Sequence, residues 1–395
     1  MLLGRCKRVA RNSLLVLVNK NNQNVHYIPH HNLVAHCTSS AAKPMRDEYS
    51  ALDSSGETHT IDLFKLENGA EIEGVQVRYS TYGKLNDSKD NVVVVCHALT
   101  GNSRLDQWWG PLLGPGLTMD TNKYFIVCAN VLGSCYGSTG PTSVNPKSGK
   151  KYDGDFPDVS VRDSVSSQID LLKKGLGVNS VKCVVGGSMG GMQTLEWLLM
   201  GKDFVKSAVV IACGAAHTAW QIAISETQRQ AIYADPLWNN GNIDESNPPS
   251  TGLAVARQVA MIWYRTSVAY EQKFSRETNS KSGEYQVKSY LQYQGNKFVG
   301  RFDAMTYVKL TAQMDSHDVG RDRGGVERAL RSIDTKVLVM GIDSDILYPL
   351  HEQRLLAQYI KNSEFKIIAS NEGHDAFLLE QKQVSESITT FLNRI

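Results

Sequence analysis

The sequence lacks the features that mark membrane, nucleic-acid-binding and disulfide-stabilised proteins. No apolar run approaches the roughly 18 residues that a membrane span needs. The formal net charge is only +2, from 42 Lys and Arg against 40 Asp and Glu, which leaves no basic footprint for nucleic acid. The seven cysteines are odd in number and form no C-x-x-C spacing, so we expect a reduced compartment, no disulfide framework and no zinc site.

Acidic residues are absent from the first 46 positions, which carry seven Lys and Arg. Without this segment, 35 basic residues stand against 40 acidic ones, so the rest of the chain has a net charge of −5. An Arg-rich segment without acids is typical of a mitochondrial transit peptide. The alternative is a disordered tail on a cytoplasmic protein, and a secretory signal fits less well because the apolar run 14–18 is short. We therefore expect residues 1–57 to be an N-terminal extension made of a transit peptide and a linker.

Runs of β-forming residues alternate with helical patterns along the rest of the chain. Residues 58–82 alternate apolar and polar side chains on either side of a turn at 67–69, which predicts an antiparallel hairpin at a sheet edge. Later runs are continuously apolar, as expected of strands covered on both faces; they are residues 92–96, 124–128, 180–185, 208–212, 336–340 and 365–369. The alternation predicts an α/β fold with a mostly parallel sheet and helices on both faces.

Strand signals largely vanish between residues 217 and 333, where helical patterns dominate, as in 252–265 and 304–314. We interpret this stretch as a helical cap, or lid, inserted into one α/β core whose two parts are residues 58–216 and 334–395. An insertion before the last two strands would lie over the carboxyl ends of the strands, which is the edge where such sheets bind ligands. We therefore expect the functional site between the core and the cap.

The stretch 184–192 contains the pattern G-x-S-x-G, with Gly186, Ser188 and Gly190 at its fixed positions. β-forming residues precede it and helix-forming residues follow it, which is the strand–turn–helix setting of a nucleophile elbow. Only small residues fit beside the serine in so tight a turn. The same pentapeptide also occurs in turns without chemistry, so this interpretation requires a base, an acid and oxyanion donors elsewhere in the chain.

The acid and the base of a triad should follow late strands, in the order Ser, Asp, His. Asp343 and Asp345 both follow the strand 336–340, and Asp345 is better placed because it lies in the loop beyond the strand. His374 follows the last strand, after a glycine and before the closing helix. An aspartate here often caps a turn, and an isolated histidine is usually a surface residue. The order of the three motifs nevertheless favours the triad Ser188, Asp345 and His374.

These side chains suit acyl transfer. A serine hydroxyl is a weak nucleophile until a base takes its proton, and His374 has the side-chain type whose ordinary pKa lies near neutrality. Asp345 would hold the imidazole in one tautomer and stabilise its charged form. The developing oxyanion needs two hydrogen-bond donors. We expect the backbone amide of Met189, directly after the nucleophile, and that of Leu99, in the loop after the strand 92–96.

The motifs together resemble the homoserine O-acetyltransferase family, acyltransferases of the α/β-hydrolase fold that act in methionine biosynthesis. The resemblance covers residues 58–395, and its double-tryptophan block is most similar to fungal members. The matching stretches are 97–101 (HALTG), 108–114 (WWGPLLG), 133–141 (GSCYGSTGP), 186–192 (GGSMGGM), 229–232 (RQAI), 341–349 (GIDSDILYP) and 373–377 (GHDAF). In combination they are far more specific than any one of them alone.

The resemblance implies transfer of an acetyl group from acetyl-CoA to the side-chain hydroxyl of L-homoserine, by a ping-pong mechanism through acetyl-Ser188. In the family, the arginine of the RQAI block and the aspartate after the catalytic histidine bind the acceptor, and these match Arg229 and Asp375. Arg229 would pair with the α-carboxylate in a forked geometry, and Asp375 with the α-ammonium. Tyr233, one helical turn beyond Arg229, is a further candidate for the pocket. Without the resemblance, a helix-surface arginine and a helix-capping aspartate would be the expected roles.

The resemblance also implies a homodimer formed through the helical insertion, acetyl-CoA as cosubstrate, and no metal ion or bound cofactor. Two other activities stay open. Serine acyltransferases of cysteine biosynthesis share the scaffold, and one methylene in a pocket changes binding by only about 1–3 kcal/mol. A carboxylesterase would use the same triad with water as the acceptor, unless the cap excludes water from the acyl-enzyme. The loop 97–101 favours acetyl over succinyl as the transferred group, and the intact triad argues against a non-catalytic binding module.

Overall fold

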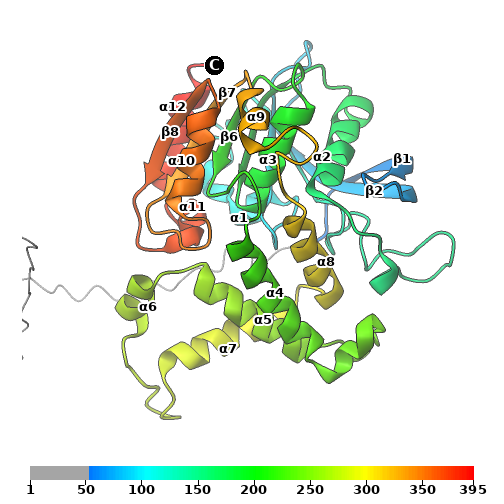
Figure 1. The fold of residues 1–395 in the computed structure, drawn as a ribbon. Helices are drawn as coiled ribbons and strands as arrows, with labels where there is room; N and C mark the ends of the chain where they lie inside the picture. Colours follow the sequence, from blue (N-terminus) through cyan, green and yellow to red (C-terminus); the bar gives the residue numbers. More distant parts are fainter. Residues whose placement is uncertain (1–52) are drawn as a thin grey trace, which may run out of the picture. The chain divides into compact units, whose positions relative to one another are not determined.

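An eight-stranded sheet runs through the part of the chain that the computed structural model describes, residues 53–395 (Figure 1). The strand order is β1-β2-β4-β3-β5-β6-β7-β8. Neighbours from β4 to β8 pair in parallel, whereas β2 runs antiparallel to both β1 and β4. This confirms the mostly parallel sheet with a hairpin at one edge. The strands are β1 (Glu57–Lys65), β2 (Glu71–Tyr82), β3 (Val92–Cys96), β4 (Phe125–Ala129), β5 (Val181–Gly187), β6 (Ser207–Ile211), β7 (Lys336–Ile342) and β8 (Ser363–Ile368).

The central strands are apolar on both faces because helices cover both faces of the sheet. Every residue of β3 and β6 is buried. Val93 and Val95 point into one hydrophobic cluster, whereas Val92 and Val94 point into the other, as the alternation of side chains along a strand requires. The first face is covered by α1 (Leu105–Trp108) and α12 (Gln381–Leu392), and the second by α2 (Val161–Asp170), α3 (Met189–Met200), α9 (Val326–Arg331) and α10 (Leu350–Tyr359).

A group of helices forms the cap, which lies below the sheet in the view of Figure 1. These helices are α4 (Ala219–Tyr233), α5 (Ser250–Trp263), α6 (Ser267–Phe274), α7 (Gln286–Val299) and α8 (Ala304–Asp315). Helix α5 packs against both α4 and α7. The structure differs from the expected boundary at 333, because the chain returns to the core directly after α8. Val319, Leu330 and Ile333 already belong to the hydrophobic cluster beneath the sheet.

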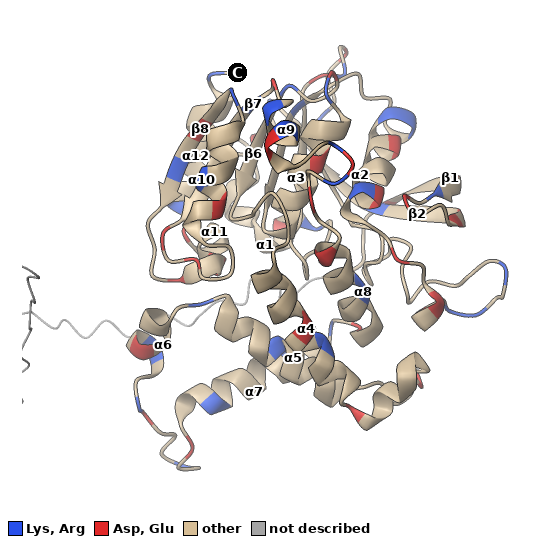
Figure 2. Ribbon diagram, viewed as in Figure 1, with Lys and Arg blue, Asp and Glu red and all other residues tan. Residues whose placement is uncertain are grey.

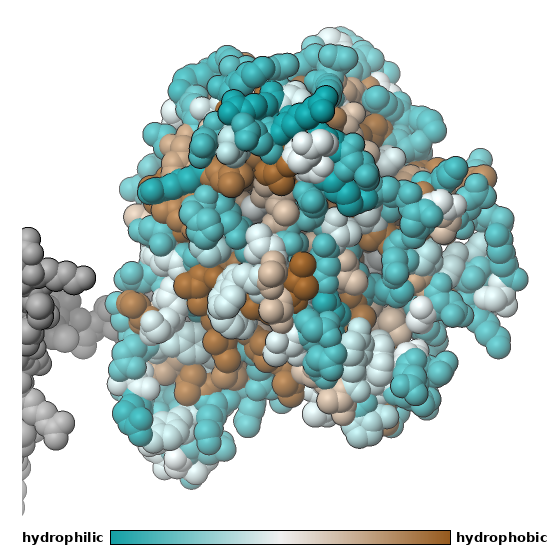
Figure 3. Space-filling view, viewed as in Figure 1, coloured by the Kyte–Doolittle hydropathy of each residue, from teal (hydrophilic) through white to brown (hydrophobic). Residues whose placement is uncertain are grey.

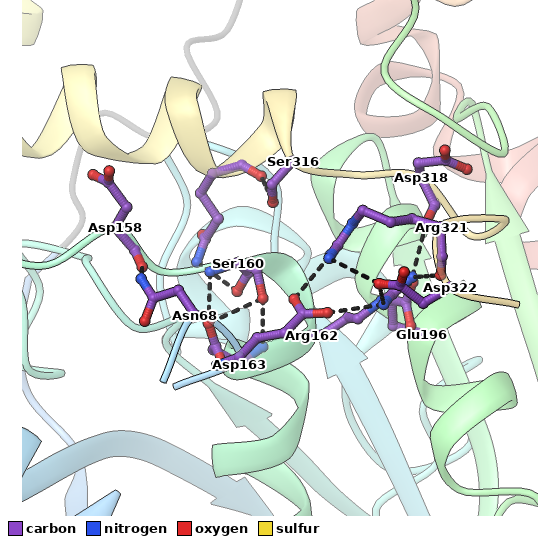
Figure 4. A network of polar contacts seen from close by, with 12 residues as sticks. Asn68, Asp158, Ser160, Arg162, Asp163, Glu196, Ser316, Asp318, Arg321 and Asp322 are labelled. Atoms are coloured by element: carbon purple, nitrogen blue, oxygen red, sulfur yellow. Dashed lines mark hydrogen bonds and ion pairs between the residues drawn. The ribbon is translucent and has the colours of Figure 1, made fainter. Parts of the chain in front are cut away.

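A network of ion pairs fastens this return from the cap to the core (Figure 4). Glu196 of α3, only 1% exposed, pairs with Arg162 of α2 at 3.3 Å and with Arg323 of the returning loop at 2.6 Å. Glu67, in the turn between β1 and β2, pairs with Arg162 and with Arg321, both at 2.8 Å. The network therefore ties the hairpin, two core helices and the segment after α8 to one another.

The part of the chain that the structure describes contains neither a cluster of side chains suited to a metal ion nor a helix that could span a membrane. No group of three His, Cys, Asp or Glu side chains within residues 53–395 is arranged to hold a metal ion. Over the same residues, no helix has both the length and the apolar character that crossing a bilayer requires. The five cysteines found there are free thiols, and basic and acidic residues are interspersed in the view of Figure 2. The predicted transit peptide lies outside the described residues.

Candidate active site

Ser188 lies at the turn between β5 and α3, in a left-handed backbone conformation with a φ of +58°. A Cβ atom on Gly186 would overlap the carbonyl oxygen of Gly190, and one on Gly190 would overlap the carbonyl oxygen of Cys96. The turn therefore requires glycine at both positions. The Ser188 N–H donates a hydrogen bond of 3.0 Å to the carbonyl oxygen of Ile211, which fixes the turn against the end of β6. This is the geometry of a nucleophile elbow.

The structure brings the three predicted triad residues together. Ser188 Oγ lies 2.8 Å from His374 Nε2, and His374 Nδ1 lies 2.7 Å from Asp345 Oδ2. Asp345 is in the loop after β7, and His374 is in a short 3-10 turn (Gly373–Asp375) after β8. All three side chains are buried. The other candidate acid, Asp343, instead accepts a hydrogen bond from the backbone N–H of Ser370 at 3.0 Å, on the surface.

The surroundings of His374 suit a base that receives the serine proton. Asp345 Oδ1 accepts the backbone N–H groups of Leu347 at 2.8 Å and Tyr348 at 2.9 Å, so the carboxylate is held on both oxygens. Because Asp345 Oδ2 accepts at Nδ1, that nitrogen carries the hydrogen and Nε2 faces the serine with a lone pair. Burial by itself would lower the pKa of His374, but the charge of Asp345 and its hydrogen bond raise that pKa above the ordinary value of 6.5.

A cavity opens onto Ser188 at the junction between core and cap. Its core side includes the loop after β3 and the turn that carries His374. Its cap side comes from α5, α7 and the loop between α5 and α6. The polar and aromatic residues that line it are Thr100, Ser188, Arg257, Tyr264, Arg265, Tyr290, Gln294, His374, Asp375 and Phe377. The site therefore combines a nucleophile from the core with charged groups from both layers.

Arg257 and Tyr264 are functional candidates that the sequence analysis missed. Arg257 is 5% exposed, and its guanidinium carbon lies 5.1 Å from the ring centroid of Phe298. The ring centroid of Tyr264 lies 5.9 Å from that of His374. No described Asp or Glu forms an ion pair with Arg257, so its charge lacks a protein counter-ion within the cavity. The available signal was an arginine within the largely apolar helix α5, where a buried charge requires a partner.

Arg229 and Tyr233 are not among the residues that line this cavity, and their contact with the acceptor stays a prediction. The Nε and Nη2 atoms of Arg229 donate to carboxylates of Glu226 at 2.8 Å and Asp315 at 2.7 Å, and its buried Nη1 has no partner among the described residues. The ring of Tyr233 packs against Trp238, with centroids 5.1 Å apart. Helix α4 packs against α5 and α8, and the ion pair between Arg229 and Asp315 joins α4 to α8.

The other predicted binding residue, Asp375, lines the cavity beside His374. Its Oδ2 lies 3.0 Å from Nε of Arg265, which itself is buried and also pairs with Glu372 at 2.6 Å. Asp375 is therefore a carboxylate next to the nucleophile with a cation already beside it. Its placement in the cavity agrees with a contact to the acceptor.

The two residues expected to supply the oxyanion amides are Met189, directly after the nucleophile, and Leu99. Met189 is the first residue of α3, where backbone N–H groups have no acceptor within the helix. Leu99 lines the cavity in the loop after β3. His97 fixes that loop, because its Nδ1 donates to the carbonyl oxygen of Ala98 at 2.8 Å and its Nε2 accepts the N–H of Val131 at 3.2 Å. Burial lowers the pKa of His97 to about 4, so the ring is neutral at pH 7.

Comparison with known proteins gives the family. A model of the alpha/beta hydrolase fold matches residues 91–381. Homoserine O-acetyltransferase of Chloroherpeton thalassium is 49% identical over 330 residues, which cover 84% of this chain and 87% of the relative. The chain belongs to the homoserine O-acetyltransferase family.

Solved structures show that this scaffold is shared by transferases and esterases. The homoserine O-acetyltransferase from Bacillus anthracis matches this family member with a TM-score of 0.79 and 26% identity, covering 85% of this chain and 97% of that one. Esterase E22 matches with a TM-score of 0.78 and 25% identity, covering 85% and 99%. Because proteins of both kinds match equally well, the acceptor must be argued from the cavity of this family member and not from its fold.

Proposed function

We propose that this family member transfers an acetyl group from acetyl-CoA to the side-chain hydroxyl of L-homoserine, a step of methionine biosynthesis. The observation that carries the proposal is a single cavity in which the hydrogen-bonded series Ser188, His374 and Asp345 lies beside Arg257 and Asp375. A cation and a carboxylate next to the nucleophile suit a zwitterionic amino acid. An apolar ester would leave Arg257 without a counter-ion, which is costly in a buried site, whereas Asp375 already has Arg265 beside it.

The first half-reaction loads the acetyl group onto Ser188. His374 Nε2 takes the hydroxyl proton as Ser188 Oγ attacks the thioester carbonyl, and the new imidazolium is stabilised by Asp345. The tetrahedral intermediate expels the thiolate of coenzyme A, which leaves as the thiol after it receives the proton from His374. The product is acetyl-Ser188 and free coenzyme A, and no metal or bound cofactor takes part in the proposed step.

The second half-reaction repeats the same chemistry in reverse on a new nucleophile. His374, neutral again, takes the proton of the acceptor hydroxyl, and the alkoxide oxygen attacks the ester carbon of acetyl-Ser188. When the intermediate collapses, Ser188 Oγ leaves and recovers a proton from His374. In both halves the oxyanion would accept hydrogen bonds from the amides of Leu99 and Met189, whose backbone positions are fixed before the reaction begins.

Recognition of the acceptor is assigned to Arg257 and Asp375. Arg257 offers a planar fork of N–H donors that matches a carboxylate, and its position over Phe298 holds that fork in the cavity. Asp375 would accept hydrogen bonds from the α-ammonium group. The two contacts fix the backbone of the amino acid, so the length of its side chain decides whether the hydroxyl reaches acetyl-Ser188. Homoserine and serine differ by one methylene, which makes serine the nearest competitor.

Hydrolysis is a further and less favoured candidate, kept because esterase E22 has a similar scaffold. Water must be kept from acetyl-Ser188 for transfer to dominate. The cap contributes the buried residues Arg257 and Gln294 and the aromatic Tyr264 and Tyr290 to the cavity, so the nucleophile lies under a protein cover. This cover supports the transferase proposal and makes the ratio of transfer to hydrolysis the quantity to measure.

A homodimer formed through the cap is part of the proposal. Exposed apolar side chains gather over the cap in the view of Figure 3, a distribution that marks interaction surfaces. The exposed large hydrophobic side chains of the cap helices include Trp220, Val255, Ile262, Val268 and Tyr293. A mitochondrial location is proposed on the composition of residues 1–46 alone, with a cytoplasmic location as the alternative.

The test is release of free thiol from acetyl-CoA by the protein lacking residues 1–46, with L-homoserine, L-serine or no amino acid. We expect release that depends on homoserine and is lost in Ser188→Ala. A preference for serine would move the protein to cysteine biosynthesis with the mechanism unchanged. Equal release without any amino acid would mean that water is the acceptor, and the transferase proposal would then be wrong.

A further inference from the structure

Residues 343–349, here called the acid loop, carry the proposed catalytic acid. Two backbone N–H groups of this loop bond to Asp345 itself, and two of its backbone carbonyl groups bond to side chains of the cap. Leu347 and Tyr348 each donate a backbone hydrogen bond to Asp345 Oδ1, at 2.8 Å and 2.9 Å. The orientation of these two peptide units therefore sets where the carboxylate lies and, through it, where the imidazole of His374 lies.

The carbonyl groups of the same loop face the cap. Gln221, in the first turn of α4 and fully buried, donates from Nε2 to the carbonyl oxygen of Leu347 at 2.9 Å. Its neighbour Trp220 donates from Nε1 to the carbonyl oxygen of Ile346, also at 2.9 Å. The Gln221 amide is itself fixed, since Nε2 also donates to Glu352 and Oε1 closes the capping box with Thr218. Two side chains of the cap thus hold the peptides that hold Asp345.

A third contact reaches the loop through a buried histidine. The hydroxyl of Tyr348 lies 3.0 Å from Nδ1 of His217, and the ring of Tyr348 packs against that of His374 with centroids 5.3 Å apart. His217 Nε2 in turn lies 3.3 Å from Ser225 Oγ of α4 and 3.6 Å from Asp315 of α8. The side chain of His217 is therefore fixed by two cap helices.

Arg229 completes this series. Its Nη2 donates to Asp315 Oδ2 at 2.7 Å, so Asp315 is held between an α4 arginine and His217. Arg229, the arginine of the RQAI motif, therefore helps to hold Asp315 beside His217 without lining the cavity itself. Three hydrogen-bonded routes thus connect the cap to the acid loop: through Trp220, through Gln221, and through His217 to Tyr348.

We propose that Gln221 and His217 are positioning residues, through which the cap sets the place of Asp345 and His374 relative to Ser188. The inference rests on the proposed catalytic role of that triad. Neither Gln221, His217 nor Tyr348 lines the cavity, so their loss should lower the rate of acylation without changing how tightly substrates bind. Displacements on the scale of 1 Å in a catalytic array cost about a hundredfold in rate.

The experiment compares Gln221→Leu and Tyr348→Phe with the matched control Gln272→Leu. Gln221→Leu removes the donor to the acid loop at similar volume, whereas Tyr348→Phe keeps the ring over His374 and removes only the hydroxyl. Gln272 is an exposed residue of α6, so the same Gln-to-Leu change there should leave activity at the wild-type level. Thermal unfolding midpoints show which variants are folded at the assay temperature.

The decisive readout is the rate at which a fluorophosphonate probe labels Ser188, because this reaction needs an activated serine but no acyl acceptor. Fluoride leaves as the Ser188 Oγ–phosphorus bond forms, and the serine proton passes to His374. We expect the labelling rate and kcat of folded Gln221→Leu to fall together, by about tenfold to a hundredfold. Both rates should fall less in Tyr348→Phe. In both variants the KM for each substrate should stay unchanged.

The inference would be overturned by folded Gln221→Leu protein that is labelled at the wild-type rate, or by a rise in KM at unchanged kcat. If Gln221→Leu protein does not fold, the labelling rate, kcat and KM of Tyr348→Phe test the inference in its place. Failure of the proposed function looks different, because wild-type protein would then be labelled normally but would not acetylate homoserine.

Discussion

Arg257 is the residue whose removal most sharply tests how the cavity recognises its acceptor. It is buried, it lines the cavity with Ser188, and no described Asp or Glu neutralises it. The changes are Arg257→Gln, which removes the charge, and Arg257→Lys, which keeps the charge but loses the planar fork of donors. If Arg257 binds the α-carboxylate, both changes should weaken the binding of homoserine and leave the KM for acetyl-CoA unchanged.

The expected size follows from the contact. A hydrogen bond to a charged partner contributes about 1.5–3 kcal/mol, and removing one partner leaves the other buried and unsatisfied. We therefore expect Arg257→Gln to cost about 3 kcal/mol, and since about 1.4 kcal/mol is a factor of ten, kcat/KM for homoserine should fall about a hundredfold. The kcat/KM of Arg257→Lys for homoserine should lie between those of wild type and Arg257→Gln, because lysine keeps the positive charge but cannot form the two parallel hydrogen bonds of a guanidinium.

The assay is steady-state thiol release at varied homoserine and fixed acetyl-CoA, with thermal unfolding to confirm that each variant is folded. The matched control is Arg229→Gln, which makes the same change in a second buried arginine that lies outside the cavity. Its KM for homoserine should equal that of wild type. The assignment is refuted if Arg257→Gln keeps the wild-type KM, and the prediction made for Arg229 is supported if Arg229→Gln raises it.

Three further predictions concern the triad and the packing of the core. Asp345→Asn should lower kcat about 10⁴-fold, because the imidazole loses its tautomer and the stabilisation of its charge; a loss below tenfold in steady-state assays would exclude this role. The kcat/KM profile should fall as pH drops through the pKa of His374, with a midpoint above 6.5, since only neutral imidazole accepts the proton. In Asp345→Asn, burial lowers that pKa and only the smaller effect of the Asp375 charge opposes it, so residual activity should extend to lower pH; a shift to higher pH would contradict this. Glu196→Ala should destabilise the fold by about 3 kcal/mol in denaturant titrations, because it leaves Arg162 and Arg323 without their buried partner, whereas an unchanged midpoint would show that the network adds no stability.

The sequence predicted secondary-structure elements and the triad motifs well, because these depend on local patterns of residues. The apolar run 92–96 became β3 with the same bounds, and the expected helix 304–314 became α8 with one further residue. The three triad candidates could be predicted to meet because each lies in the turn or loop after a strand of a parallel sheet, and the carboxyl ends of such strands meet at one edge. Chain order then selected Asp345, which the structure places against His374.

The sequence could not show which cap side chains line the cavity, because that depends on how the helices cross. Arg229 and Arg257 are both buried arginines on amphipathic cap helices, and nothing in their spacing says which one faces Ser188. Only the packing of α5 between α4 and α7 turns Arg257 toward the cavity and leaves Arg229 to pair with Asp315. The cap boundary was misplaced for a related reason, because residues 316–333 contain helical signals but pack on the core.

The central claim is that acetyl-Ser188 forms and is discharged by an amino acid. The direct measurement is mass spectrometry of the active-site peptide after incubation with acetyl-CoA alone, followed by a chase with L-homoserine or buffer. The account predicts an acetyl group on Ser188 that persists in buffer and passes to homoserine as O-acetylhomoserine. Rapid loss of the acetyl group as acetate in buffer, at the rate seen with homoserine, would contradict it, as would an acetyl group on a peptide without Ser188.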